Sequence, residues 1–199
     1  MLVFGSFLVR VAGGVAAFVF LASGAARAAD FVLDTDHTQA EFTVTHLAIS
    51  HVRGQVPLAS GTIAIGANDL PTAVSATLDV KSIETQDADR DRDLRGADWF
   101  DVDKYPTMTF VAKKISGTPA AFTIDGDLTF HGVTKPVVLT AKEEGKIVDG
   151  RGRTHVGFTA ATTIDRRDWG LDWGKTTPGG ALVVANDVTI DLNVEAVSK

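Results

Sequence analysis

The residue types best suited to chemistry are gathered in one short stretch, "DADRDRDLRGADWF" (residues 87–100). It holds five aspartates and three arginines and ends on two adjacent aromatic residues. Opposite charges recur three or four residues apart, a spacing that stabilises an exposed helix by roughly 0.2–0.5 kcal/mol per pair. The pairs are Asp87/Arg90, Asp89/Arg92 and Asp91/Arg95. A surface helix and the polar mouth of a binding site are both compatible with this stretch.

Other reactive residue types are sparse. The chain has no cysteine, which excludes disulfides, zinc–thiolate sites, iron–sulfur clusters and a cysteine nucleophile. Its histidines show no ligand spacing such as HExxH, so we expect no metal site; they are His37, His46, His51, His131 and His155. No G-x-S-x-G motif is present, and the carboxylates of residues 165–168 fit a bend that carries a tryptophan. We expect no catalytic residues and no enzyme, with a hydrolase as a minor alternative.

Residues 1–28 have the features of a secretory signal peptide. They include no acidic residue, contain an apolar run from Val11 to Ala22, and end in Ala26-Arg27-Ala28, which matches an A-x-A cleavage site. Their positive charge is weak, so an uncleaved membrane anchor is a minor alternative. Residues 29–199 carry 17 basic and 25 acidic residues, a formal charge of −8. This charge argues against nucleic acid as a partner and against attraction to anionic membranes through bulk charge.

Beyond residue 30 the chain alternates apolar and polar residues, as half-buried strands do. The alternation is clearest at 74–80, 122–130 and 188–194, and further strands are expected at 40–46, 48–56, 59–66, 106–115, 136–147 and 152–164. We predict an all-β domain over 29–199 with about eight antiparallel strands, in a closed barrel or a sandwich. The barrel is favoured because eight strands close around one small ligand. The charged stretch is the one helix expected, and it would close an end.

Four motifs occur in a familiar order: "DTDHTQAEFTVTHLAISHVRGQV", "SIETQDADRDRDLRGADWFDVDKYPTMTF", "IDGDLTFHGVTKPVVL" and "GFTAATTIDRRDWGLDW". Together they resemble the motifs of the YceI-like family over residues 30–197. The resemblance implies an exported, lipocalin-like barrel that encloses a polyisoprenoid chain, such as an isoprenoid quinone or a prenyl phosphate. The chain departs from the family pattern at Asp93, where a histidine is expected, and has Trp99 and Trp169 where phenylalanines are usual.

A hydrocarbon tail needs a continuous dry tube, and burial supplies about 0.8 kcal/mol per CH₂. The candidate wall residues are Phe42, Val44, Leu78, Met108, Phe110, Phe122, Ile124, Phe130 and Phe158. The alternative is that these side chains fill a solid core. Four aromatic residues, Trp99, Phe100, Trp169 and Trp173, are expected at the mouth or in a lid formed by residues 165–187.

The charged residues near the mouth are candidates for contacts with a lipid head group. A collar of Arg90, Asp91, Arg95 and Arg166 would donate to a quinone carbonyl or pair with a phosphate. The alternative is a structural ion-pair network that holds the helix over the barrel end. Because Asp93 is an anion and the chain is acidic, a neutral quinone is favoured.

A secreted structural or interaction module with a filled core is the other functional alternative. No bound cofactor is expected besides the lipid ligand. The resemblance also suggests a membrane redox partner of the cytochrome b561 type, and a homodimer is left open.

We predict that export in a bacterium cleaves the chain after Ala28, because the A-x-A pattern follows an apolar run. Amino-terminal sequencing of the exported protein checks this. A chain that still begins at Met1 would indicate a membrane anchor instead.

Overall fold

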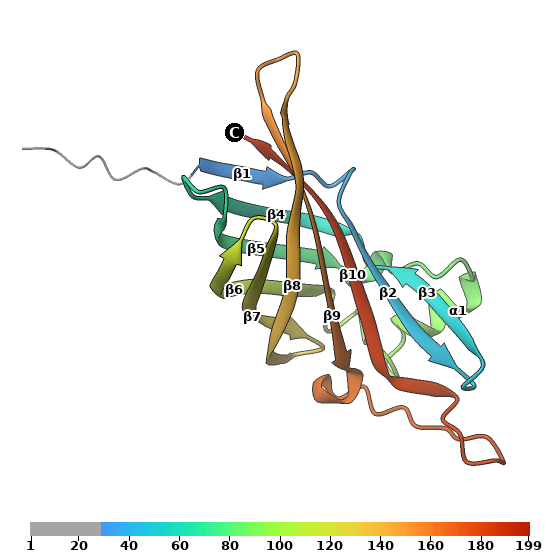
Figure 1. Cartoon of the computed structure of the whole chain (residues 1–199). Helices are drawn as coiled ribbons and strands as arrows, with labels where there is room; N and C mark the ends of the chain where they lie inside the picture. Colours follow the sequence, from blue (N-terminus) through green and yellow to red (C-terminus); the bar gives the residue numbers. More distant parts are fainter. Residues whose placement is uncertain (1–28) are drawn as a thin grey trace, which may run out of the picture.

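The computed structural model describes residues 29–199, and the predicted signal peptide lies outside the described residues. The chain forms a β-sheet, an α-helix and two short 3₁₀ helices (Figure 1). The strands are β1 (Ala29–Leu33), β2 (Gln39–His46), β3 (Ser50–Gln55), β4 (Leu58–Ile65), β5 (Pro71–Asp79), β6 (Thr107–Thr118), β7 (Ala121–Phe130), β8 (Val133–Val148), β9 (Thr154–Asp165) and β10 (Val184–Ser198). The helical elements are η1 (Val80–Ser82), α1 (Ala88–Arg95) and η2 (Arg166–Trp169). None of these helices has the length and apolar character needed to cross a membrane.

The sheet closes on itself as an antiparallel barrel in the order β1-β4-β5-β6-β7-β8-β9-β10, with β1 pairing back onto β10. β1 and β2 follow each other along one edge of β10 and act as a single bent strand. β3 and β4 follow each other along the far edge of that bent strand. The ring therefore has eight strands, as predicted, and the arrangement is a barrel rather than a sandwich.

Alternating side chains build the barrel wall. In β7 the buried residues are Phe122, Ile124, Gly126, Leu128 and Phe130, and the residues that alternate with them are partly exposed. In β8, Leu139 is buried whereas Val138 is 50% exposed on the outer surface. A strand with one apolar face must cover it, and a closed sheet lets every strand cover its face in one shared interior.

The predicted helix forms over Ala88–Arg95. Asp87 is its N-cap and accepts hydrogen bonds from the backbone N–H groups of Asp89 and Arg90, and Gly96 ends it. Of the three predicted ion pairs, Arg92–Asp89 is present, with 2.8 Å between Nη1 and Oδ1 and both side chains exposed. The other two predicted pairs are wrong among the described residues, because Asp87 caps the helix and Asp91 is buried against another segment.

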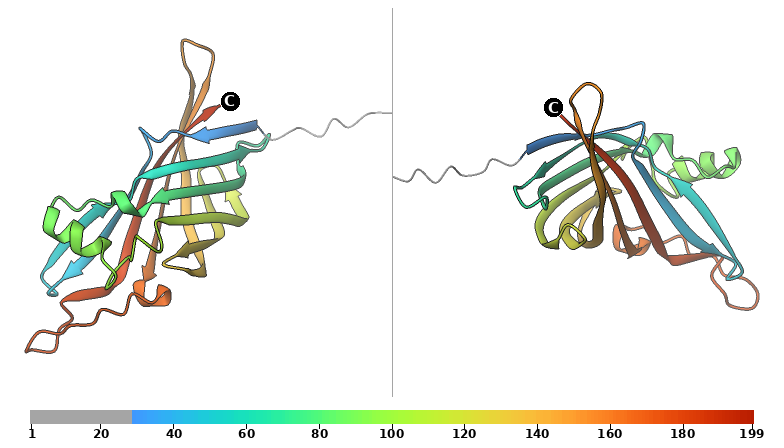
Figure 2. Two further views of the ribbon diagram at one scale, coloured as in Figure 1. Left: turned by 180° about the vertical axis from the view of Figure 1, so that it is seen from behind. Right: turned by 45° about the horizontal axis from the view of Figure 1, so that its top comes forward.

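The segment between β5 and β6 fills the side of the barrel where β3 has no full strand partner. Val56, Val80, Ile83 and Val102 form a small buried cluster there, and Leu94 of α1 packs against it. A single bridge joins residues 55 and 84. As a result α1 lies beside β3 at one end of the barrel (Figure 2).

We predict that Gly126→Ala destabilises the protein by about 1–3 kcal/mol, the usual cost of overpacking. A Cβ at Gly126 in β7 would lie 2.4 Å from the Phe110 ring and 2.8 Å from the Val111 carbonyl oxygen, so the neighbouring backbone must shift. Gly150→Ala is the matched control, because nothing lies within 4 Å of its Cβ position. Urea unfolding of both variants checks this, and equal stabilities would contradict it.

Candidate functional site

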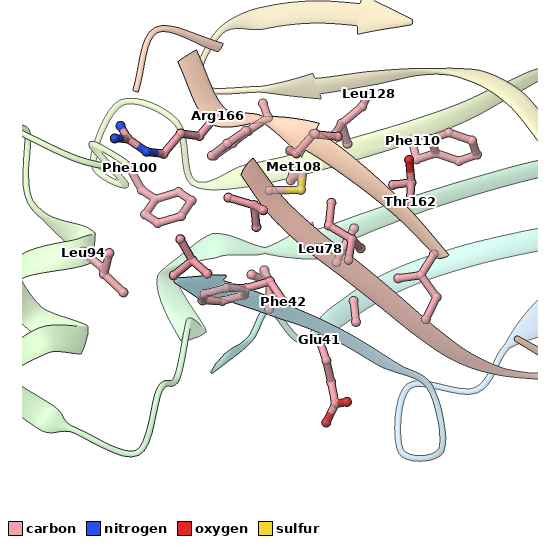
Figure 3. Close-up of a pocket in the computed structure, with 18 of the residues that line it drawn as sticks. Glu41, Phe42, Leu78, Leu94, Phe100, Met108, Phe110, Leu128, Thr162 and Arg166 are labelled. Carbon is pink, nitrogen blue, oxygen red and sulfur yellow. The ribbon is translucent and has the colours of Figure 1, made fainter. Parts of the chain in front are cut away.

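A cavity of about 1050 Å³ occupies the barrel interior (Figure 3). Its wall consists mainly of inward-facing residues of the strands, from Leu33 at the end of β1 to Val194 in β10. It reaches the surface at the end where α1 lies, because exposed residues there, including Asp93, Asp98 and Lys175, are part of its lining. The interior is therefore not the solid core that was the alternative from the sequence.

All nine predicted wall residues lie in the cavity lining. Phe122, Ile124 and Phe158 are buried around its inner part, whereas Phe42, Leu78 and Met108 also pack against the small cluster beneath α1. That these residues contact a ligand stays a prediction.

Sequence reasoning missed other wall residues that the same alternation could have found. They include Leu33, Ile63, Val74, Leu128, Val137, Thr162, Ile164, Ile190 and Leu192. Thr162 shows the signal clearly, since it follows Phe158 and Ala160 on the inward face of β9.

Three of the four predicted mouth aromatics line the cavity: Trp99, Phe100 and Trp173. The rings of Trp99 and Trp173 lie 5.0 Å apart between centroids, which joins the segment after α1 to the segment after η2. Lys175 Nζ lies 5.3 Å from the centroid of the Trp173 ring, within cation–π distance. Phe100 packs inward on Phe130 at 5.1 Å.

The prediction that Trp169 belongs to the lid is wrong. Its side chain is 2% exposed and lies in the main core cluster, outside the cavity lining. η2 folds back on the barrel, which lets Trp169 Nε1 donate to the Leu128 carbonyl at 3.2 Å. The left-handed backbone of Gly170 (φ 76°) ends η2 at this point.

The four residues of the predicted collar do not come together. Arg90 and Arg166 line the cavity, whereas Asp91 and Arg95 do not. Asp91 is 7% exposed and accepts from the backbone N–H of Thr85 at 2.8 Å and from its hydroxyl. Arg95 donates to the carbonyls of Lys81 and Ile83, each at 2.7 Å.

Arg90 and Arg166 are also engaged with the protein itself. Arg90 donates to the Thr85 hydroxyl at 2.8 Å and to the Thr85 carbonyl at 2.7 Å. Arg166 is 4% exposed, and burial lowers the pKa of its guanidinium. It donates to the carbonyls of Leu171, Trp173, Val184 and Ala185 and to the Asn186 side chain. Arg90 and Arg166 therefore do not form the ion-pair network that was the structural alternative, because their partners are carbonyl, hydroxyl and amide oxygens rather than carboxylates. That they contact a head group stays a prediction.

The α1 side of the mouth is rich in carboxylates. Asp87, Asp89, Asp93 and Asp98 all line the cavity. The backbone hydrogen bond from Arg90 lowers the pKa of Asp87, so this carboxylate remains charged at neutral pH. Arg92, the third arginine here, pairs with Asp89. An anionic ligand would therefore meet negative charge at this side of the mouth.

The histidines lie away from the cavity wall, except for His46 at its rim. His155 lies between Glu195 (2.7 Å) and Asp149 (3.1 Å), and both hydrogen bonds raise its pKa.

On the outer surface, possible metal-ligand atoms of Asp34, His37 and Glu195 lie within 4.8 Å of one another. This group was not identified from sequence spacing, because its members come from distant parts of the chain. The expectation that the protein binds no metal stays a prediction.

Comparison with known proteins agrees with this architecture. Residues 31–196 match the family model described as the YceI-like domain. A UPF0312 protein of Shewanella putrefaciens is 36% identical over 184 residues, which cover 90% of this chain and 93% of that protein.

Solved structures of similar proteins have the same fold. The Campylobacter jejuni YceI protein is 29% identical with a TM-score of 0.69, over 78% of this chain and 90% of that one. A polyisoprenoid binding domain from Saccharophagus degradans shares the fold, with a TM-score of 0.59 and 16% identity over 87% of this chain and all of that domain. By sequence and by fold, the chain belongs to the YceI-like family.

Proposed function

We propose that this protein is an exported carrier or store of an isoprenoid lipid, whose apolar tail occupies the barrel cavity. The observation that carries the proposal is the size and character of that cavity. Its volume of about 1050 Å³ is at the upper end of the roughly 300–1,000 Å³ found for small-molecule sites. An apolar wall of that extent carries a hydrophobic penalty while water occupies the cavity.

Water is a poor occupant for such a space, because each buried molecule needs about two to four polar partners. The wall offers few of them, since most of its lining is aliphatic or aromatic. A long apolar chain removes the penalty and gains about 0.8 kcal/mol for each CH₂ that it buries. The shared fold with a domain that binds polyisoprenoid supports this choice of ligand.

The proposed head group is neutral, as in a quinone. The guanidiniums of Arg90 and Arg166 already bind backbone carbonyls, so a phosphate finds no uncommitted arginine among them. The carboxylates on the α1 side of the mouth also disfavour an anion. A quinone carbonyl needs only a single hydrogen-bond donor.

Export rests on the sequence of residues 1–28, and a membrane redox partner such as a cytochrome b561-type protein follows from the family resemblance alone. The cavity weighs against a structural module with a filled core. For a hydrolase, the site described here has no nucleophile paired with a base.

We predict that organic extraction of the purified protein releases a stoichiometric isoprenoid lipid, identified by mass spectrometry. Ile124→Trp should shorten the longest tail retained, because Ile124 is 6% exposed and lies in the cavity wall, where an indole takes up volume. Val138→Trp is the matched control, since Val138 is 50% exposed on the outer surface of neighbouring β8. The control should retain the wild-type lipid.

Two results would contradict this prediction. One is wild-type protein that releases no lipid after expression in a host that makes isoprenoids. The other is a folded Ile124→Trp variant with an unchanged distribution of tail lengths.

We also predict that Arg90→Gln and Arg95→Gln have equal, small effects on lipid affinity, although Arg90 lines the mouth and Arg95 does not. Each variant loses charged hydrogen bonds to carbonyls, which should destabilise the fold by about 1–3 kcal/mol. Titration of a quinone and a prenyl phosphate of equal tail length, beside urea unfolding, measures both effects. A loss of phosphate affinity confined to Arg90→Gln would show a head-group role for Arg90. Tighter binding of the phosphate than of the quinone would contradict the neutral head group.

A further inference from the structure

Two loops extend past the barrel at the open end of the cavity and form what we call the lip. The lip consists of the β2–β3 hairpin tip, residues 46–51, and the segment 173–183 that leads into β10 (Figures 1 and 2). The Leu47 N–H donates to the Val183 carbonyl at 2.9 Å, and His46 pairs with Val184. The two loops therefore present one continuous surface.

The lip is apolar at its tip. Ile49 is 85% exposed, more than any other large hydrophobic side chain among the described residues. Leu47 and Ala48 have left-handed backbones, with φ of 53° and 61°. Glycine or asparagine suits such a turn better, so the turn geometry does not explain why apolar residues occur there. An exposed apolar side chain in this position gains free energy only when something covers it.

The lip also differs in charge from the α1 segment beside it, which it meets at Trp99 and Trp173. Residues 42–68 and 173–186 contain no aspartate or glutamate, in a chain with 25 acidic residues. Lys175 and Arg53 lie on or next to the lip and are exposed. The α1 side, by contrast, carries Asp93 and Asp98. A neutral to positive surface with an apolar tip complements phospholipid, whose phosphates lie just outside the hydrocarbon.

The lip is continuous with the cavity, since Trp173, Lys175 and Val183 line the cavity as well. Trp173 stacks on Trp99 at 5.0 Å, which places two half-buried indoles at the border between lip and mouth. Indoles and lysines favour the membrane–water interface, where an apolar ring and a polar edge are both accommodated. From the tip of the lip to the mouth of the cavity, the side chains are thus first aliphatic and then basic and aromatic.

We propose that the lip docks onto a phospholipid bilayer, with Ile49 inserted and the cavity mouth facing the membrane. A lipid tail would then pass between the bilayer and the barrel without crossing water. This inference rests on the proposed lipid-binding function. It requires no attraction through net charge, because the free energy comes from burial of the apolar tip.

Vesicle flotation tests the proposal, with protein that starts at Ala29 so that the apolar residues 1–28 do not themselves bind lipid. Phosphatidylcholine vesicles are compared with vesicles that also contain phosphatidylglycerol. Ile49→Asp should lower the partition coefficient at least about tenfold, the loss expected for one buried isoleucine. Ile147→Asp is the matched control, since Ile147 is 66% exposed on the β8–β9 hairpin that projects elsewhere on the barrel (Figure 1).

The lipid content of each variant separates this inference from the proposed function. Ile49 is not part of the cavity lining, so Ile49→Asp should retain co-purified lipid while its transfer of lipid to vesicles slows. Wild-type protein that does not bind vesicles, or an equal loss in Ile49→Asp and Ile147→Asp, would overturn docking and leave lipid retention untouched. A wild-type dimer that Ile49→Asp converts to monomer, without vesicle binding, would assign the lip to a second copy of the chain and also overturn the proposal.

Discussion

The pairing of β1 with β10 is the constraint on which the rest of the structure depends. It joins Phe31, Val32 and Leu33 to Ser198, Val197 and Ala196, and so turns an open sheet into a closed wall. After Leu33 the chain bends and β2 continues along the same edge of β10. At that end β3 pairs with β2 but not with β5. The ring of strands is therefore open between β3 and β5. The segment between β5 and β6 fills this gap, and the cavity opens beside it.

Beyond the ends of the strands, arginine side chains donate the hydrogen bonds that backbone N–H groups donate within the sheet. Backbone carbonyls outside a sheet or helix still need donors when they are partly buried. Arg95 supplies them to Lys81 and Ile83, and Arg90 supplies one to Thr85. Arg166 does the same for the segment after η2 and for the first residues of β10, since two carbonyls from each accept hydrogen bonds from its buried guanidinium. These side chains resemble a binding collar in sequence, but in the structure they hold irregular backbone in place.

The residues of the cavity wall could be predicted from the sequence, whereas the arginine contacts that hold the irregular segments could not, for a physical reason. A period of two determines which side chains share a face, so Phe122, Ile124 and Phe158 could be assigned to the interior from the sequence. The partners of Arg95 are two backbone carbonyls, those of Lys81 and Ile83, which lie 14 and 12 residues earlier in the chain. Their positions depend on how the segment between β5 and β6 packs. Trp169 was misplaced for the same reason, since η2 had to fold back before its indole could reach Leu128. Alternation also cannot tell a filled interior from a hollow one, because that depends on the ring size and on how far β2 and β3 bend away.

The commitment of the arginines to the backbone limits how this site can select a ligand. With Arg90 and Arg166 bonded to backbone carbonyls, the main favourable contribution to binding of the proposed lipid would be burial of its tail. That contribution grows by about 0.8 kcal/mol per CH₂ and does not depend on the head group. For the proposed lipid, selection would therefore come mainly from the wall, whose residues limit the length of tail that fits, and the carboxylates of the α1 side would disfavour an anionic head group. Weak recognition of the head group would suit the proposed carrier, because tight recognition would slow release of the lipid at its destination.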